Sequence, residues 1–128
     1  MTNIIVTGHG GYAAAVKGNL SMLTGRTENM TFVDFNPGED LDTLIAHLTE
    51  ASQACGDGEL LFCSDLTGGS PFRQSAVLCA GHPGWITVAG INAAAYAEMV
   101  FNLDKSAEEL AEMAISVTKM TVARFPKE

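Results

Sequence analysis

The sequence predicts a single α/β domain built on an open, mostly parallel three-layer sheet. Four short, continuously apolar segments are rich in β-branched and aromatic residues, which is typical of strands buried on both faces. Segments with helical periodicity lie between them, as right-handed crossovers between parallel strands require. The chain has 128 residues, of which 47% are hydrophobic, so it is long and apolar enough to bury one core. We therefore interpret residues 1–128 as one domain.

The four predicted strands are the apolar runs themselves. They are residues 3–6 (NIIV), 31–35 (TFVDF), 59–63 (ELLFC) and 85–89 (WITVA). The C-terminal tail, residues 121–128, is a candidate for an additional edge strand. The alternation of strands and helices then predicts the order β-α-β-α-β-α-β-α-α.

The first two predicted helices rest on apolar residues spaced three or four positions apart. The first helix has such residues at Val16, Leu20 and Leu23, and the second at Leu41, Leu44, Ile45 and Leu48. Glu39 and Asp40 precede the second helix, where acidic side chains favour a helix N-terminus.

The other three predicted helices begin at capping signals. Ser70 and Pro71 fit an N-cap followed by the first helical residue. Asn92 begins the next helix, and Ser106 with Glu109 forms a capping box for the last. The faces that we expect to be buried are Ala76, Val77 and Ala80; Tyr96, Met99 and Val100; and Leu110, Met113, Ala114 and Val117.

Charge and cysteine content exclude several classes of protein. Seven basic residues against fifteen acidic ones give a net charge of −8, which argues against nucleic acid or an anionic membrane as a partner. No apolar run is long enough to cross a bilayer, and the first residues lack a basic signal-peptide region, so we expect a cytoplasmic protein. Cys55, Cys63 and Cys79 form no CxxC pair, and we interpret them as reduced thiols of the core. No cluster with metal-ligand spacing occurs.

The chemistry is expected in the loops that follow the first and third strands. Ligands of open α/β sheets bind beyond the carboxyl ends of the strands, at the point where the strand order reverses. In a flavodoxin-like strand order of 2-1-3-4, that point lies between residues 7–11 (TGHGG) and residues 64–71 (SDLTGGSP). These are also the two most unusual loops of the chain.

His9 lies among glycines in the first of these loops. It is a candidate nucleophile, acid–base group or ligand, and the alternative is an incidental loop histidine. His47 falls in the second predicted helix and His82 in a turn before Pro83. We interpret both as solvated or structural histidines.

The second of these loops has the composition of an anion site. Gly68 and Gly69 free the backbone to turn its N–H groups inward, and the following helix favours negative charge at its start. Thr67 and Ser70 add hydroxyl donors. Asp65 would repel a bare phosphate, so we expect it to hold a histidine ring by its second nitrogen. The alternative is a tight turn in which Ser70 is a plain N-cap.

A competing motif resembles the dinucleotide-binding fingerprint. Gly8, Gly10 and Ala13 match its spacing between a strand and a helix, and Asp34 lies where the ribose-binding acid is expected. The chain is short for a dehydrogenase with a substrate domain, and the fingerprint gives no reason for a histidine inside the glycine turn. We therefore do not favour dinucleotide binding.

Three segments together resemble a known family. Residues 4–10 (IIVTGHG), 34–39 (DFNPGE) and 65–72 (DLTGGSPF) look like the EIIA domains of the mannose family, in the bacterial phosphoenolpyruvate-dependent sugar phosphotransferase system (PTS). Residues 90–92 (GIN) fit as well, and the resemblance covers roughly residues 2 to 120. The GGSPF block in register with the histidine loop is the specific part.

The resemblance implies a flavodoxin-like domain, usually a homodimer, that takes a phosphoryl group from phosphohistidine on HPr and passes it to an EIIB domain. Its phosphorylated histidine maps to His9, its aspartate near that ring to Asp65, and its phosphate-cradling serine to Ser70. The EIIC and EIID membrane subunits, where sugar specificity lies, would take part only indirectly. Transfer between two histidines needs positioning more than metal, so we expect no cofactor, nucleotide or magnesium.

This sequence departs from the family in two ways. It ends at Glu128, so EIIB is expected to be a separate chain, and Thr67 stands where some members have tryptophan. Two alternative functions remain open: an EIIA-like phosphodonor subunit for a dihydroxyacetone kinase, and a non-catalytic nucleotide- or flavin-binding module. Residues 68–72 favour an EIIA component of sugar transport, the sugar branch of the family, over a subunit for a dihydroxyacetone kinase. Apolar residues near the C-terminal helices agree with a homodimer: Met99, Phe101, Met113, Met120 and Phe125.

Overall fold

The structure, a computed structural model, describes residues 1–127 and has the predicted order of elements. The strands are β1 (Asn3–His9), β2 (Met30–Phe35), β3 (Leu60–Ser64) and β4 (Trp85–Ala89). The helices are α1 (Tyr12–Leu23), α2 (Leu41–Ala54), α3 (Ser70–Ala80), α4 (Ala93–Met99) and α5 (Ala107–Thr121). All four strands are parallel and lie in the order β2-β1-β3-β4, which confirms the predicted sheet.

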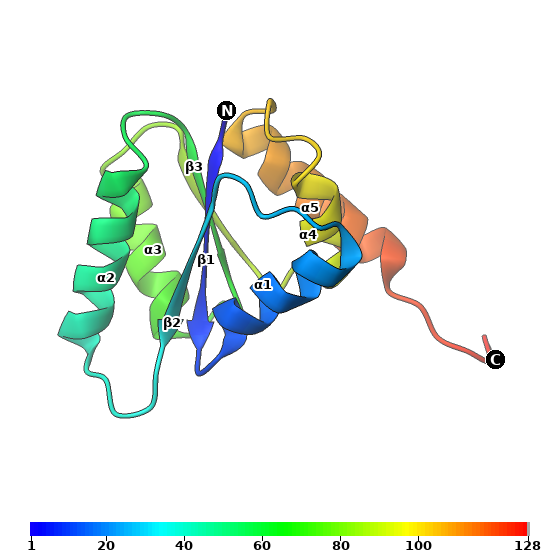
Figure 1. Ribbon diagram of the computed structural model, residues 1–128, viewed down its shortest axis with the longest axis horizontal. Helices are drawn as coiled ribbons and strands as arrows, with labels where there is room; N and C mark the ends of the chain where they lie inside the picture. Colours follow the sequence, from blue (N-terminus) through cyan, green and yellow to red (C-terminus); the bar gives the residue numbers. More distant parts are fainter. Residues whose placement is uncertain (128) are drawn as a thin grey trace.

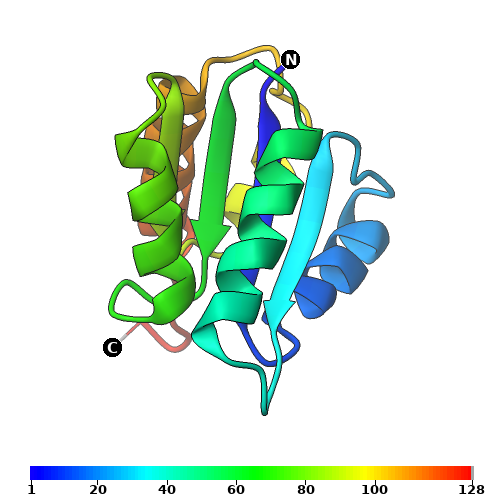
Figure 2. The ribbon, with the colours of Figure 1, turned by 90° about the vertical axis from the view of Figure 1, so that its left-hand side faces the viewer.

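Two layers of helices cover the sheet. Helices α2 and α3 lie on one face, and α1, α4 and α5 lie on the other (Figures 1 and 2). Successive residues of β1 alternate between the two layers, because side chains along a strand point to opposite faces. Ile4 and Val6 belong to the core shared with α1, α4 and α5, and Ile5 belongs to the core shared with α2 and α3. Every residue of the central strand β3 is buried.

Three of the predicted helix starts are confirmed. The Asp40 carboxylate accepts a hydrogen bond from the Thr43 N–H at 2.9 Å, and hydrogen bonds from Thr43 hold the pKa of Asp40 below its usual value. Asn92 caps α4 through the Ala95 N–H, and Ser106 with Glu109 forms the predicted capping box of α5. The caps of α2 and α4 fix where the loops after β2 and β4 end, at the carboxyl edge of the sheet, whereas α5 begins at the opposite edge, beside Thr2 and Glu59.

The predicted start of α3 is wrong by one residue. Gly69, not Ser70, is the N-cap, with the extended angles φ −91° and ψ 165°, and no side chain caps the helix. Ser70 is already the first helical residue and Pro71 the second, a position where the missing N–H costs nothing. The Ser70 hydroxyl is therefore not committed to a cap.

The predicted buried face of α3 is also wrong. Val77 is 65% exposed and Ala80 is exposed, whereas Pro71 and Ser75 are buried. Ser75 tolerates burial because its hydroxyl donates to the Pro71 carbonyl oxygen at 2.7 Å. An apolar pattern alone could not reveal that a serine points inward.

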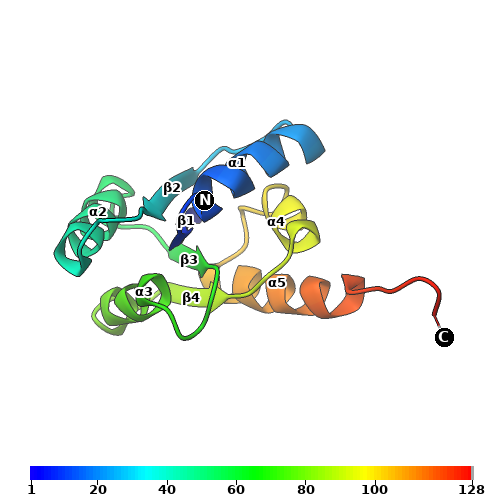
Figure 3. The same cartoon turned by 90° about the horizontal axis from the view of Figure 1, so that it is seen from below.

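The expected edge strand at the C-terminus is not formed by residues 122–127. Helix α5 runs through Thr121, and the chain then leaves the domain as an extended tail (Figures 1 and 3). Pro126 has no N–H to donate to a strand ladder, and its carbonyl oxygen accepts a local hydrogen bond from Arg124. Glu128, the last residue of the predicted strand, lies outside the described residues.

The three cysteines are free thiols, as we interpreted them. Cys63 is buried in β3, and Cys55 and Cys79 are partly buried against the core beneath α2 and α3. Burial raises the pKa of Cys79 to about 11 and that of Cys63 further, so both are protonated near neutral pH. No helix within residues 1–127 combines the length and apolar character needed to span a bilayer.

Candidate functional site

His9 is the last residue of β1 rather than a member of the loop that follows it. The parallel ladder continues through Gly8 to His9, which pairs with Phe35 of β2. The chain then turns at Gly10, whose φ of +60° suits glycine and whose N–H donates to the Phe35 carbonyl oxygen at 2.8 Å. This turn brings His9 out at the carboxyl edge of the sheet, the edge that faces the viewer in Figure 3.

The structure joins His9 directly to Asp65, as the sequence predicted. One carboxylate oxygen, Oδ2, lies 2.9 Å from the ring Nδ1 and also accepts the His9 backbone N–H at 2.9 Å. Because an ionised carboxylate can only accept hydrogen bonds, this contact favours a proton on Nδ1 and leaves the lone pair on Nε2. The His9 side chain is 46% exposed and that of Asp65 20%, so the ring is open to a reactant.

Gly69 makes room for the His9 ring. A Cβ atom at position 69 would overlap ring atom Cε1, which neighbours both ring nitrogens. The φ of Gly69 is −91°, a value open to any residue, so the requirement for glycine is spatial and not conformational. The loop after β3 therefore carries both the hydrogen-bond partner of the ring and the surface on which the ring lies.

Some backbone groups of the loop after β3 already form hydrogen bonds within the loop and with the first turn of α3. The Gly69 N–H donates to the Leu66 carbonyl oxygen at 3.2 Å, and the Gly69 carbonyl oxygen accepts the Arg73 N–H. Thr67 and Gly68 are exposed, and Ser70 is half-buried at the first position of α3. The first turn of a helix has unsatisfied N–H groups, so this loop can receive an anion beside the histidine.

Asp34 has a role that the sequence interpretation missed. Helix α1 has Gly11 as its N-cap and no capping side chain of its own. The Asp34 carboxylate, at the end of β2, instead accepts the Ala13 N–H at 2.7 Å and caps α1 from a neighbouring strand. Two features of the sequence could have indicated this role. The start of α1 is glycine-rich and has no residue that can cap it, and an acidic residue, Asp34, lies near the end of the following strand.

Tyr12 and Tyr96 also come together at this edge, although no sequence signal paired them. Their hydroxyl oxygens lie 2.6 Å apart, and the Tyr12 ring packs where a side chain on Gly8 would be. Gly8 is therefore needed to admit the tyrosine ring.

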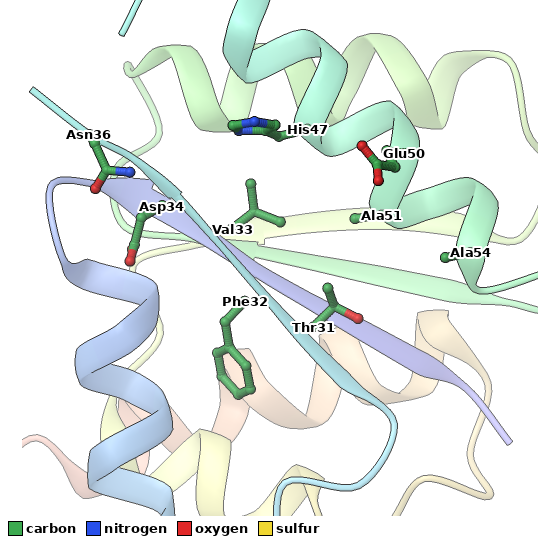
Figure 4. A pocket seen from close by; sticks show the side chains of 9 residues that line it. All are labelled: Thr31, Phe32, Val33, Asp34, Asn36, His47, Glu50, Ala51 and Ala54. Carbon is green, nitrogen blue, oxygen red and sulfur yellow. The ribbon is translucent and has the colours of Figure 1, made fainter. Parts of the chain in front are cut away.

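The other two histidines lie away from His9. The His82 ring stacks on Trp85 with centroids 3.8 Å apart and planes inclined by 12°, which fits the predicted structural role. His47 is exposed on α2 and lines a groove of about 480 Å³ between β2 and α2. Figure 4 shows this groove, with His47 and Glu50 on α2 and with Asp34 and Asn36 at the end of β2. His9 and Asp65 do not line it, so it is separate from the candidate site.

Metal ligands do not gather at the site in the part of the chain that is described. Within residues 1–127, no three side chains of His, Cys, Asp or Glu lie close enough together to hold a metal ion. The chemistry that the site itself offers is that of an oriented imidazole beside a helix start.

Comparison with known proteins finds one matching family. The EIIA-man profile, described as "PTS system fructose IIA component", matches residues 3–117. The mannose-specific PTS EIIAB component of Escherichia coli K12 is 34% identical over 122 residues, which cover 90% of this chain and 37% of that protein. The fructose-specific PTS EIIA component of Bacillus subtilis is 31% identical over 93 residues, 72% of this chain and 64% of that protein. This chain thus spans little more than a third of the length of the E. coli relative.

Solved structures share the fold. A mannose/sorbose-specific IIA subunit from Enterococcus faecalis superposes with a TM-score of 0.90 at 22% identity, over 97% of this chain and 94% of that one. A PTS EIIA component from Streptococcus agalactiae gives 0.88 at 22% identity, with 98% of both chains covered. The family match extends from β1 into α5 and includes both loops of the site, and this chain therefore belongs to the EIIA-man family of sugar phosphotransferase system components.

Proposed function

We propose that this protein is a phosphoryl carrier of the sugar phosphotransferase system and works in the cytoplasm. It accepts a phosphoryl group from phosphohistidine on HPr, holds it on Nε2 of His9 and passes it to EIIB. The observation that carries this proposal is the 2.9 Å contact between His9 Nδ1 and Asp65 Oδ2, which favours a proton on Nδ1 and a free lone pair on Nε2 of a half-exposed ring. Family membership supports the same reaction class.

The transfer step uses the two nitrogens of His9 differently. The Nε2 lone pair attacks phosphorus as the bond to the donor histidine breaks, and the donor leaves as neutral imidazole. The proton on Nδ1 stays where it is. As the Nε2–P bond forms, the ring gains positive charge, which the Asp65 carboxylate stabilises across the 2.9 Å hydrogen bond. The second step, in which the phosphoryl group passes from His9 to EIIB, uses the same arrangement of His9 and Asp65.

The start of α3 is proposed to hold the transferred group. Phosphoryl oxygens would meet the helix N-terminus, the Ser70 hydroxyl and the backbone around Thr67 and Gly68. Ser70 supports this assignment because its hydroxyl does not cap the helix. Gly69 contributes by letting the ring lie close to these donors, since its own N–H already bonds to Leu66.

One structural feature argues against the alternative of a nucleotide- or flavin-binding module. The Asp34 carboxylate, which would bind a ribose, already caps α1. The family profile and the sugar-specific names of the relatives likewise favour the sugar branch over a dihydroxyacetone kinase subunit.

The carrier function can be tested with phosphoenolpyruvate, Enzyme I and HPr. We expect an acid-labile phosphoryl group on the protein, seen as radiolabel or as a mass increase, that is absent from His9→Ala. His47→Ala and His82→Ala are matched controls and should label fully, because neither ring lies at the site. Full labelling of His9→Ala would refute the assignment.

The proposed partners include a second copy of the chain. Two of the residues expected at a dimer surface are not available for one: Met99 is fully buried and Met113 packs against the core. Phe101, Met120 and Phe125 are exposed, the last at 97%, and they support a homodimer that covers them. Light scattering should report a dimer at micromolar concentration, and a monomer would contradict this part of the proposal.

HPr and EIIB are proposed to bind in turn to the same surface around His9. The net charge of −8 favours partners with basic faces, so both affinities should fall as salt is added. A titration should show that HPr and a separate EIIB chain compete for one subunit. Simultaneous binding of both to the same subunit would exclude a shared surface.

A further inference from the structure

The His9 ring has a further neighbour in the ring of Phe35, the last residue of β2. The two residues pair across β1 and β2, and their ring centroids lie 6.2 Å apart with the planes inclined by 51°. This distance is within the range of aromatic contacts. Phe35 is partly buried and packs against the core shared with α2 and α3, so its own ring is held in place.

The contacts reach the His9 ring from two sides, because β1 lies between β2 and β3 in the sheet. Asp65 and Gly69 belong to the loop after β3, whereas Phe35 approaches from the end of β2. On the β3 side, Cε1 and Nε2 are the ring atoms closest to the place that a Cβ at position 69 would occupy. The Nε2 edge of the ring therefore faces the loop that leads into α3.

The hydrogen bond to Asp65 does not by itself fix the plane of the His9 ring. It holds one atom, Nδ1, and the torsion about the Cβ–Cγ bond of a histidine is intrinsically broad. The His9 side chain is 46% exposed, so little else surrounds it. A swing of the ring toward β2 would turn Nε2 away from the start of α3, and the Phe35 ring lies on that side.

We propose that Phe35 is a positioning residue for phosphoryl transfer, whose ring limits the swing of the imidazole toward β2 and keeps Nε2 directed at the start of α3. The inference rests on the carrier function proposed above. Phe35 acts through His9 and needs no contact with the phosphoryl group. It raises the rate because in-line attack depends on a closely defined position of the nucleophile.

The first test needs no phosphoryl transfer. Phe35→Leu keeps an apolar side chain against the core and removes the planar ring. Carbon-13 NMR relaxation of the His9 ring should show greater motion in Phe35→Leu than in the wild-type protein, and Phe35→Tyr, which keeps an aromatic ring, should restore the wild-type value. Phe32→Leu is the matched control, because Phe32 lies on the same strand but packs against the core on the opposite face of the sheet. It should leave the motion of the His9 ring unchanged.

The second test compares two phosphoryl donors. Phospho-HPr must dock before transfer, whereas phosphoramidate is a small donor that needs no docking surface, and its P–N bond breaks with loss of ammonia as the Nε2–P bond forms. Phe35→Leu should slow phosphorylation of His9 by about tenfold with either donor, as expected for one lost aromatic contact. The KM for phospho-HPr should stay close to the wild-type value. Phe35→Tyr should recover most of the rate, and Phe32→Leu should change it by less than about twofold.

Circular dichroism checks that each variant is folded at the assay temperature, and Phe35→Met replaces the leucine variant if that variant does not fold. Three results would overturn the inference. The first is unchanged motion of the His9 ring in Phe35→Leu. The second is a raised KM for phospho-HPr with a wild-type rate from phosphoramidate, which would make Phe35 a docking contact. The third is equal slowing in Phe32→Leu, which would indicate a general loss of packing.

Failure of the carrier function gives a different result. In that case the wild-type protein takes up no phosphoryl group from either donor. The NMR comparison of Phe35→Leu with Phe32→Leu then decides whether Phe35 restrains the His9 ring.

Discussion

His9 and His82 are both exposed histidines at strand ends, and they occupy opposite edges of the same sheet. His9 ends β1 at the carboxyl edge, whereas His82 lies just before β4 at the amino edge, where its carbonyl oxygen accepts the Trp85 N–H. The His9 ring meets a carboxylate at 2.9 Å, and the His82 ring meets the face of an indole. An indole face holds a ring in place without choosing which nitrogen carries the proton. A carboxylate favours a proton on the nitrogen that it contacts, so exposure alone does not distinguish the histidine that we propose to be reactive.

The largest expected effect comes from removing the Asp65 carboxylate, which leaves the His9 ring without a charged hydrogen-bond partner, as the His82 ring is. Asp65→Asn should slow phosphoryl transfer by about 10³- to 10⁴-fold, because an amide can accept from or donate to Nδ1 and no longer fixes the tautomer or stabilises the charged ring. Rapid-quench measurement of His9 phosphorylation gives the rate, and circular dichroism should report an intact fold. A change of less than about threefold would show that the carboxylate does not set the reactivity of His9.

A smaller effect is expected from displacing the ring while its carboxylate stays. Gly69→Ala introduces a Cβ that overlaps the ring, so His9 must move, and a misplacement on the order of 1 Å lowers rates by about 10²-fold. Gly18→Ala is the control, because a Cβ there meets open space on α1. A crystal structure of Gly69→Ala with an unmoved His9 ring, or a wild-type rate, would contradict the spatial role of this glycine.

The smallest expected effect comes from Ser70→Ala, which leaves the imidazole and its partner intact. Phosphorylation should slow by about tenfold through loss of one hydroxyl donor to the phosphoryl group, while the backbone donors remain. Because Gly69 is the N-cap, the midpoint of thermal unfolding should stay nearly unchanged. A loss of stability comparable to that from removing a helix cap, about 1 kcal/mol, would instead support the original capping role.

The sheet could be predicted because each strand is a continuous apolar run and each crossover has helical periodicity. The end of β1 could not be predicted, since the strand continues through Gly8 to His9 and glycine gives no strand signal. The burial of α3 was mispredicted because Ser75 satisfies its hydroxyl within the helix and can face the core. These errors come from interactions that the apolar pattern does not encode.

The core of the candidate site could be predicted as well, because parallel strands deliver their following loops to one edge. That rule placed His9 beside Asp65, which the 2.9 Å contact confirms. The spatial role of Gly69 and the contact between Tyr12 and Tyr96 could not be predicted, since they depend on which atoms meet after folding. The cap that Asp34 provides for α1 was missed for a similar reason. From its position in the sequence, the carboxylate could equally bind a ribose or accept a backbone N–H group.

The long-range cap at Asp34 links the surroundings of His9 to the order in which the chain is made. During synthesis, β1 and the first turn of α1 leave the ribosome before β2, so the helix start has no acceptor for the Ala13 N–H until Asp34 has been added. Asp65 follows later still. A chain truncated before Asp65 therefore lacks the carboxylate that contacts the His9 ring, and we expect such a chain to take up no phosphoryl group.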